Sequence, residues 1–272
     1  MPELPEVETT RRGVEPYVTG RTILALQIHE VRLRWPVDAD IPARVQGALI
    51  LGAARRAKYL IFILNNGGNL LLHLGMSGSL RVLPASTPRL KHDHLDLQLD
   101  SGKTLRFNDP RRFGSLHYIQ GNPETHPLLC KLAPEPFDKQ FNSDYLWKLT
   151  RKRRVAIKQL IMNAHCVVGV GNIYASEALF RAGVCPKRMA RSLKRVEIAR
   201  LVAKISEVLT QAIKVGGTTL RDYVSADGKP GYFRQKLFVY ERAGKSCRIC
   251  QATIRQTIQG NRSTYWCPTC QH

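Results

Sequence analysis

The stretch Leu95-Asp96-Leu97-Gln98-Leu99-Asp100 alternates apolar and polar residues with a period of two. That period is typical of a β-strand with one face on a core and the other in water. Four earlier apolar runs also read as strands: 22–28, 49–54, 59–64 and 69–74. The Asn-Asn-Gly-Gly sequence at 65–68 is a hairpin signal between two of them. Residues 1–120 are therefore predicted to form an antiparallel β-sandwich, with a helix over about 6–17 that carries the N-terminus.

The period becomes helical in the second half of the chain, after a Pro-rich stretch at 121–135 that reads as a linker. Apolar residues recur at helical spacing over 198–212, with Ser192 placed to cap this helix and Gly216-Gly217 to end it. Shorter helices are predicted at 143–150, 155–163 and 172–182. The fold class is thus α+β, with a helical domain at 136–231 that ends in a loop over 216–231, and a cysteine-rich segment at 232–272.

Basic residues outnumber acidic ones, 42 Lys and Arg against 21 Asp and Glu, which gives a net charge of +21. Residues 1–120 carry +5 of this charge and residues 121–272 carry +16. Such a surplus indicates a polyanionic partner, because each neutralised phosphate releases condensed counterions. A membrane surface is the competing polyanion, but no apolar run approaches the roughly 20 residues that span a bilayer. The N-terminus is acidic and has no apolar signal segment, so we expect an intracellular protein.

The seven cysteines divide into a terminal group of four and three scattered residues. In the terminal group, Cys247 and Cys250 form one Cys-x2-Cys pair, Cys267 and Cys270 form another, and 16 residues separate the pairs. This spacing predicts a zinc ribbon with one structural ion, since four protein ligands leave no position for a substrate. A disulfide pairing is the alternative, which an intracellular location disfavours. The scattered residues are expected to be buried thiols: Cys130, Cys166 and Cys185.

Pro2 follows the initiator Met1 and precedes Glu3. If Met1 is removed, the chain begins with a secondary amine, and an α-amino group that titrates near 8 is about one-tenth unprotonated at pH 7. Such an amine is a plausible nucleophile toward a carbonyl-like carbon, with Glu3 as the nearby proton carrier. The alternative is that Pro and Glu only begin a helix, where proline fits the first turn and acids suit the positive end of the dipole.

The sequence Gly169-Val170-Gly171-Asn172 precedes a predicted helix. Glycines there allow backbone N–H groups to approach a phosphate, with Asn172 as helix cap and side-chain donor. An ordinary loop and cap is the alternative. The basic run at 151–154, together with Lys158, favours the phosphate interpretation.

Two further segments, 73–78 and 108–114, read as tight turns that present large side chains. Met76, Arg111 and Phe113 are of the types that wedge into a base stack in proteins that unstack or flip bases. The alternative for Met76 and Phe113 is a place in the core.

Together these segments resemble bacterial formamidopyrimidine-DNA glycosylase, in order from Pro2 to Cys270. The segments that carry the resemblance are MPELPEVET at 1–9, Ala-Lys-Tyr-Leu at 57–60, both tight turns, 169–174 and the ribbon. The resemblance implies a bifunctional enzyme that removes oxidised purines, chiefly 8-oxoguanine and ring-opened purines, and cuts the abasic strand by β,δ-elimination. It also implies a helix-two-turn-helix domain, one structural Zn²⁺ and no organic cofactor. Double-stranded DNA is the implied partner of a monomer in the bacterial cytoplasm, associated with the nucleoid.

The resemblance also implies residue roles. Pro2 attacks the sugar C1′ and Glu3 acts as general acid and base. Lys58 contacts the phosphates that flank the lesion and assists β-elimination, and Arg262 on the ribbon hairpin promotes δ-elimination. Glu6 lines the pocket, and the loop after Gly216 folds over the damaged base. The implied DNA contacts are His73, His92, Arg111, Arg153, Asn172 and Tyr240, and the side chains implied to fill the gap left by the everted nucleotide are Met76, Arg111 and Phe113.

The chain departs from the family at 162–165, where Met-Asn-Ala-His replaces a stretch that resembles Met-Asp-Gln. This departure affects hydrogen bonding in the helix-two-turn-helix rather than the reaction. Two other functions stay open. An oxidised-pyrimidine glycosylase of the same superfamily is disfavoured by Leu4 and Phe113. A zinc-ribbon DNA-binding protein without activity explains the charge and the cysteines but gives no reason for Pro2 and Glu3.

Overall fold

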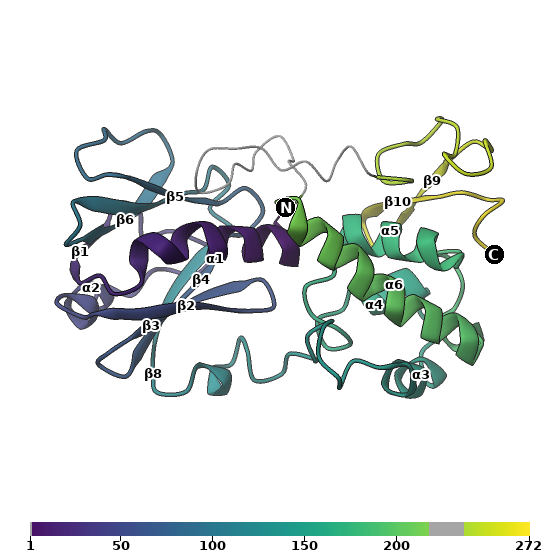
Figure 1. Cartoon of the computed structure of the whole chain (residues 1–272), viewed down its shortest axis with the longest axis horizontal. Coiled ribbons are helices and arrows are strands. Elements are labelled where there is room, and N and C mark those ends of the chain that lie inside the picture. The colour runs from purple at the N-terminus through teal and green to yellow at the C-terminus, as the bar shows by residue number, and fades with distance from the viewer. Residues whose placement is uncertain (1, 218–236) are drawn as a thin grey trace. The chain divides into compact units, whose positions relative to one another are not determined.

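The computed structural model describes residues 2–217 and 237–272 (Figure 1). These residues divide into two compact units. The N-terminal unit extends to Cys130 and includes the residues from Val215 to the end of the first described range, and the C-terminal unit contains Lys131–Lys214 and the second described range. The finer division into a linker, a helical domain and a zinc-finger domain stays a prediction.

The N-terminal unit is a sandwich of two four-stranded antiparallel sheets. The first sheet has the order β1 (Ile23–Ile28), β6 (Asp93–Leu99), β7 (Lys103–Asn108), β5 (Ser79–Pro84). The second has the order β2 (Ile50–Arg56), β3 (Tyr59–Leu64), β4 (Gly68–His73), β8 (Ser115–Gln120). The sequence patterns predicted five of these strands and missed β5, β7 and β8.

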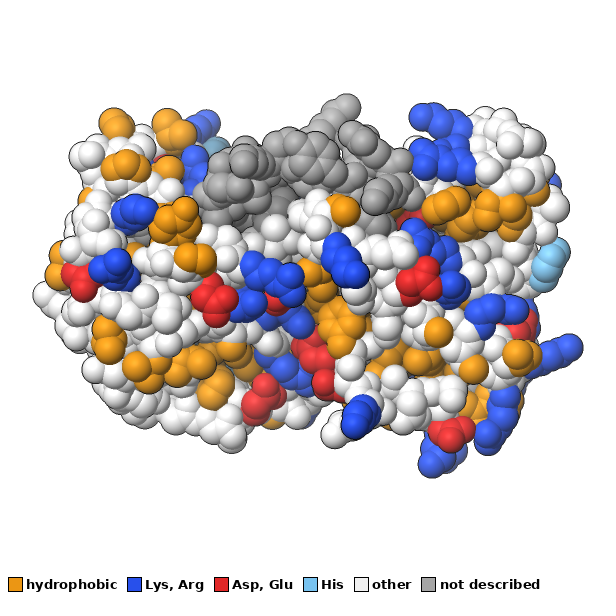
Figure 2. Space-filling view, viewed as in Figure 1, with side chains coloured by type: hydrophobic (Ala, Val, Ile, Leu, Met, Phe, Trp, Pro, Cys, Tyr) orange, Lys and Arg blue, Asp and Glu red, His pale blue; other side chains and the backbone are white. Residues whose placement is uncertain are grey.

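One hydrophobic core lies between the sheets and includes residues of both, for example Leu97 of β6 and Phe62 of β3. Outward-facing Leu51 and Ile63 are exposed, and Figure 2 shows apolar side chains over this part of β2 and β3. The expectation that the polar face of β6 is in water is wrong. Asp96 is buried because Arg106 of the neighbouring strand donates to both of its carboxylate oxygens, at 2.7 and 2.9 Å.

Helix α1 (Leu4–Val18) packs against β2 and β3 of one sheet and β5 of the other. Its start is fixed by a proline in the first turn and by a capping box, a pattern typical of helix N-termini. The described part of the unit also contains a short helix α2 (Ile41–Val45) and a 3-10 turn at Pro123–Thr125. The predicted N-terminal helix is therefore confirmed, and the sandwich holds its first turn in place.

The described residues of the C-terminal unit form helices and one two-stranded hairpin. Helix α5 packs against α6, α4 and the hairpin strand β10, and α3 packs against α6. The elements are α3 (Ser143–Arg151), α4 (Ile157–Ile161), α5 (Asn172–Ala182), a 3-10 turn (Ala190–Ser192), α6 (Arg195–Lys214), β9 (Arg255–Gln259) and β10 (Arg262–Trp266). Within the described residues, no helix has both the length and the apolar character needed to cross a membrane.

Several local predictions for this half need correction. Ser192 does not cap α6; its hydroxyl donates to the Met189 carbonyl inside the 3-10 turn, and Glu197 instead accepts the Lys194 N–H at 2.7 Å. Of the three scattered cysteines only Cys166 is buried, because Cys130 lies in the exposed chain that leaves the sandwich and Cys185 is half-buried.

Candidate DNA-binding and catalytic site

Pro2 and the side chains of Glu3 and Glu6 are buried at the start of α1. The Glu3 backbone N–H donates to Glu6 Oε2 at 2.9 Å, which is one half of the capping box that these two residues form. Both carboxyl groups therefore lie at the positive end of the helix dipole, which stabilises negative charge. The structure thus brings the predicted nucleophile and proton carrier together at one buried helix end.

Gly217 lies directly against Glu6. A Cβ on Gly217 would come within 2.9 Å of Glu6 Oε1, and the residue has a φ of +79°. Both features favour glycine at this position. The chain that leaves α6 therefore passes the Glu6 carboxyl group. The predicted lesion-covering loop lies outside the described residues from 218 onward.

Lys58 and His73 form a second group, on the β2–β3 turn and at the end of β4. The Lys58 turn is tight, with a φ of +53° at Ala57. His73 stacks at a tilt on Tyr59, with ring centroids 4.8 Å apart, and its Nδ1 accepts the Gly75 N–H at 3.0 Å. Burial is the main cause that lowers the pKa of His73 to about 4, and the positive charges of Lys58 and Arg34 contribute to the same shift. His73 is consequently neutral at pH 7. Because Nδ1 accepts a hydrogen bond, the single ring proton is on Nε2, which can donate a hydrogen bond but carries no positive charge.

We expect this histidine to make the N-terminal unit less stable in acid. The folded-state pKa is about 4, and the unfolded value is near 6.5. Between pH 6.5 and pH 4 the unfolded chain therefore binds more protons than the folded protein does. The contribution of His73 to the free energy of unfolding falls by up to about 1.4 kcal/mol per pH unit as the pH drops through this range. His73→Asn retains an acceptor for Gly75 and cannot titrate. Hydrogen exchange of β3 and β4 amides at pH 7, 5.5 and 4.5 measures the difference, and a pH-independent difference contradicts the assignment.

His92 belongs to a loop that polar groups tie to the first sheet. Arg106 donates to the carbonyls of Thr87 and Pro88, both at 3.0 Å, and Asp93 accepts the Leu90 N–H at 2.8 Å. His92 itself is half-buried and has a φ of +73°, which few non-glycine residues adopt. The fold therefore holds His92 in a defined backbone conformation.

Met76, Arg111 and Phe113 are exposed on two loops of the N-terminal unit. The exposed fractions of Met76 and Phe113 are 36% and 41%, so neither is a core residue. The Arg111 guanidinium lies over the Phe113 ring, 4.8 Å from its centroid. Large side chains are thus presented to solvent, as a wedge into a base stack requires.

Lys158 has a place in the C-terminal unit that the sequence did not indicate. Its side chain is 2% exposed, whereas the basic run had suggested a surface cation. Its Nζ donates to Asn172 Oδ1 at 2.6 Å, to the Ser263 carbonyl at 3.0 Å and to Thr264 Oγ1 at 2.8 Å. Lys158 therefore joins α4, the start of α5 and hairpin strand β10.

Asn172 does not cap α5, because the cap position is Gly171. Its side chain contacts the hairpin: Asn172 Nδ2 donates to the Ser263 carbonyl at 3.0 Å. The predicted donation to a phosphate stays a prediction. Arg262, next to Ser263, begins β10 directly after the Gly260-Asn261 turn and is exposed. The turn at 169–172 and the strand that carries Arg262 are therefore held together by side-chain hydrogen bonds.

Glu177 is another buried group that the sequence did not single out. Its carboxyl group accepts three successive backbone N–H groups, from Phe238 at 2.9 Å, Val239 at 2.9 Å and Tyr240 at 3.0 Å. Burial raises the pKa of Glu177, and these N–H groups oppose that rise. Tyr240 also packs edge-on against Tyr265 of β10, at 5.1 Å. α5 thus fixes the backbone of one predicted DNA contact.

The remaining predicted contact, Arg153, is exposed after the end of α3, where its N–H donates to the Thr150 carbonyl. Arg153, Asn172, Tyr240 and Arg262 belong to the C-terminal unit, and the other predicted contacts and catalytic residues belong to the N-terminal one. Figure 2 shows Lys and Arg side chains on the surface of each unit, with fewer Asp and Glu among them.

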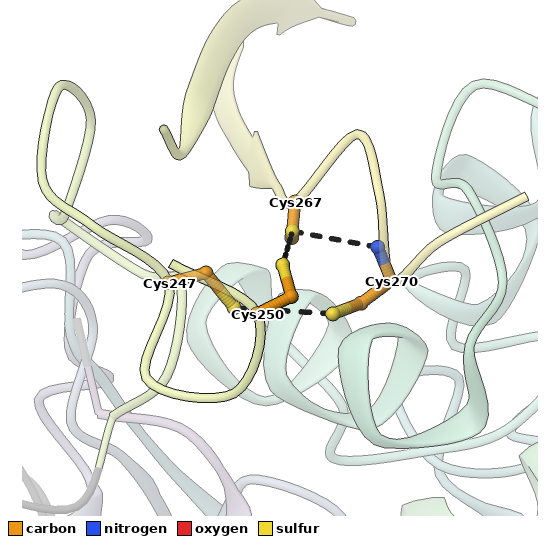
Figure 3. A group of neighbouring side chains, drawn as sticks. All are labelled: Cys247, Cys250, Cys267 and Cys270. Atoms are coloured by element: carbon orange, nitrogen blue, oxygen red, sulfur yellow. Dashed lines mark hydrogen bonds between the residues drawn. The ribbon is translucent and has the colours of Figure 1, made fainter. Parts of the chain in front are cut away.

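The four terminal cysteines converge on one point (Figure 3). All four sulfurs lie within 4.8 Å of one another, and two pairs are 3.9 and 3.4 Å apart, as free thiols. Tetrahedral bonds of about 2.3 Å to one ion place sulfurs about 3.8 Å apart, so the cluster fits a metal site. The backbone N–H of Ala252 is the main group that lowers the pKa of Cys250, to about 7, whereas burial raises the pKa of Cys267 and of Cys270. A bound cation would favour the thiolate at each position.

Comparisons with known proteins cover both units. Residues 1–116 match the family model of the formamidopyrimidine-DNA glycosylase N-terminal domain, and residues 132–224 match that of the formamidopyrimidine-DNA glycosylase H2TH domain. The curated formamidopyrimidine-DNA glycosylases of Thioalkalivibrio sulfidiphilus and Alkalilimnicola ehrlichii are 59% and 53% identical, each over 100% of both chains.

Two solved structures have the same fold over nearly the whole chain. The MutM (Fpg) protein of Thermus thermophilus is 40% identical, with a TM-score of 0.90, and the match covers 99% of this chain and 98% of that one. The Lactococcus lactis Fpg in complex with abasic-site DNA is 34% identical, with a TM-score of 0.92 and 99% of each chain covered.

The fold and its sites define a protein with an N-terminal glycosylase domain and a helix-two-turn-helix domain. The chain belongs to the formamidopyrimidine-DNA glycosylase family. The resemblance inferred from the sequence is confirmed.

Proposed function

We propose that the protein removes oxidised purines, including 8-oxoguanine and formamidopyrimidines, from duplex DNA and cleaves the strand at the resulting abasic site. The observation that carries this proposal is the convergence of Pro2, Glu3 and Glu6 at one buried helix end. The names of the relatives support it, as do Lactococcus lactis Fpg structures with Fapy-dG DNA and with abasic-site DNA.

The first step uses Pro2, after removal of Met1, as a nucleophile. Its nitrogen lone pair forms a bond to C1′, and the bond to the base breaks with its electron pair on the leaving base. The attacking nitrogen loses its proton, and the leaving base takes up one proton, so that the charge balances. Glu3 donates a proton to the ring oxygen O4′ as the sugar opens, which yields an iminium. The iminium acidifies the neighbouring C2′–H, and loss of that proton expels the 3′-phosphate. The C2′=C3′ double bond that results makes the C4′–H acidic, and loss of that proton breaks the C5′–O bond and expels the 5′-phosphate.

The other predicted residues bind and orient the DNA. Lys58 would neutralise the phosphates next to the lesion, and neutral His73 beside it would donate a hydrogen bond rather than charge. Arg262, exposed at the hairpin tip, would hold the phosphate that leaves in the second elimination. Arg153, Asn172 and the remaining basic residues would contact the backbone, where most protein–DNA hydrogen bonds are made.

We propose that the four-cysteine site holds one Zn²⁺ with a structural role. Four sulfur ligands in tetrahedral spacing suit zinc and leave no open position. The ion would join the loop before β9 to the end of β10. In this way it would set the position of Arg262 and of the carbonyl and hydroxyl groups that Lys158 contacts.

The experiment offers the protein duplexes that contain 8-oxoguanine, a formamidopyrimidine, thymine glycol or an abasic site, with and without borohydride. We expect excision of both purine lesions, strand cleavage at the abasic site and a covalent protein–DNA complex with borohydride. Faster excision of thymine glycol than of 8-oxoguanine would identify an oxidised-pyrimidine glycosylase. Binding without cleavage of abasic DNA would identify a non-enzymatic DNA-binding protein.

A further inference from the structure

The two loops that carry the exposed wedge side chains share a single carboxyl group. Asp109 is completely buried at the end of β7. Its Oδ1 accepts the Ser77 hydroxyl at 2.6 Å and the Arg111 N–H at 3.3 Å, and its Oδ2 accepts the Gly114 N–H at 2.8 Å. The Ser77 oxygen also accepts the Arg111 N–H, at 3.2 Å. Asp109 thus joins the loop of Met76 to that of Arg111 through hydrogen bonds at three sites.

The loops also touch through their backbones. Gly75 has a φ of +67°, and a Cβ on it would lie 2.4 Å from the carbonyl carbon of Phe113. A side chain at Gly75 would therefore separate the loops. The backbone of Asp109 is fixed to the sheet, because its N–H donates to the His92 carbonyl at 3.0 Å and His94 Nε2 lies 2.8 Å from its oxygen.

We propose that Asp109 is a positioning residue that makes the two loops one rigid wedge, so that Met76, Arg111 and Phe113 enter the duplex together. Each wedge side chain is exposed, so contact with the duplex would displace it if its loop could move independently of the other loop. A buried carboxyl group that accepts hydrogen bonds from both loops prevents that motion, because breaking these hydrogen bonds would leave buried donors without an acceptor. The inference rests on the proposed function, in which these side chains replace an everted nucleotide.

The test compares single-turnover excision of 8-oxoguanine from a paired duplex and from a duplex in which the lesion is a one-nucleotide bulge. In the bulge no opposite base is left without a partner, so the wedge has little to replace. We expect Asp109→Ala to slow excision from the paired duplex by roughly 10- to 100-fold, as a displacement of about 1 Å does. Excision from the bulge, and cleavage of an abasic site placed in the same kind of bulge, should stay near the wild-type rate.

Asp109→Asn serves as the conservative variant. Its amide oxygen can accept the Gly114 N–H while its NH₂ donates to the Ser77 oxygen, so we expect partial rescue. Ser77→Ala removes only the bridging hydroxyl and covers the case in which Asp109→Ala does not fold. Asp100→Asn is the control for the chemical change alone, because the exposed Asp100 accepts a backbone N–H, that of Thr22, but contacts neither loop.

A double variant separates positioning from general destabilisation. If Asp109 acts through the wedge, the double variant Asp109→Ala/Phe113→Ala should excise 8-oxoguanine from the paired duplex only slightly more slowly than Phe113→Ala alone. Equal slowing on paired, bulged and abasic substrates, or additive losses in the double variant, would overturn the proposal. Failure of the proposed function has a different signature, because the unmodified protein would then excise 8-oxoguanine from neither duplex.

Discussion

A protein with one additional residue between Met1 and Pro2 is expected to lose the borohydride-trapped complex and to excise 8-oxoguanine at least about a thousandfold more slowly. The extra residue converts the Pro2 amine into an amide, which has no lone pair available for attack. α1 begins at Leu4 and its capping box uses Glu3 and Glu6, so the fold does not depend on a free terminus. Intact-mass measurement verifies the processed state, and single-turnover gels measure excision and trapping.

Glu3→Gln is the matched companion to that variant. It leaves the amine free and keeps a side-chain oxygen that can accept the Glu6 backbone N–H, but it cannot carry a proton. We expect normal DNA binding with excision slowed by roughly 10²- to 10⁴-fold. An extended protein that still traps lesion DNA at the wild-type rate would contradict the assignment of Pro2, and trapping lost only on replacement of Lys58 would move the nucleophile to that residue.

The sequence predicted the parts of the fold that depend on local pattern. The alternation at β6 and the helical period of α6 depend only on residues close together in the sequence. The cysteine spacing is set by the geometry of a tetrahedral metal site. The strands β5, β7 and β8 were missed because their apolar residues are few and polar residues interrupt them. In β7, for example, only Leu105 and Phe107 are apolar, and the polar residues Thr104 and Arg106 are buried as well.

The buried polar groups could not be predicted, since their partners are distant in sequence. Lys158 looked like part of a basic surface, but its contact Thr264 lies 106 residues further on. Glu177 accepts N–H groups more than 60 residues away, and Asp109 contacts Ser77 across 32 residues. A charged residue inside an apolar run, as at Lys158 between Ile157 and Leu160, is the one local signal that indicates such a group.

Removal of the metal is expected to unfold the hairpin and the segment around it while the sandwich stays folded. The sulfurs of Cys247 and Cys267 lie inside a small cluster with Val239, Ile254 and Tyr265. A two-stranded hairpin with so small a core is not stable alone, so metal binding supplies its folding energy. The sandwich has a separate and much larger core. Hydrogen exchange before and after chelation measures both units, and thiol titration should detect four newly reactive cysteines.

The same treatment should weaken DNA binding, because loss of β10 removes Arg262 and frees Lys158 and Asn172 from their partners. Each lost phosphate contact lowers the slope of log affinity against log salt by about 0.9. The slope should therefore fall on chelation and recover when Zn²⁺ is added back, whereas Cys130→Ser, at an exposed cysteine outside the cluster, should change neither the slope nor the metal content. Elemental analysis that finds no metal, together with two disulfides in the terminal group, would refute the site. If the slope of log affinity against log salt concentration is the same with and without metal, phosphate binding does not depend on the ribbon.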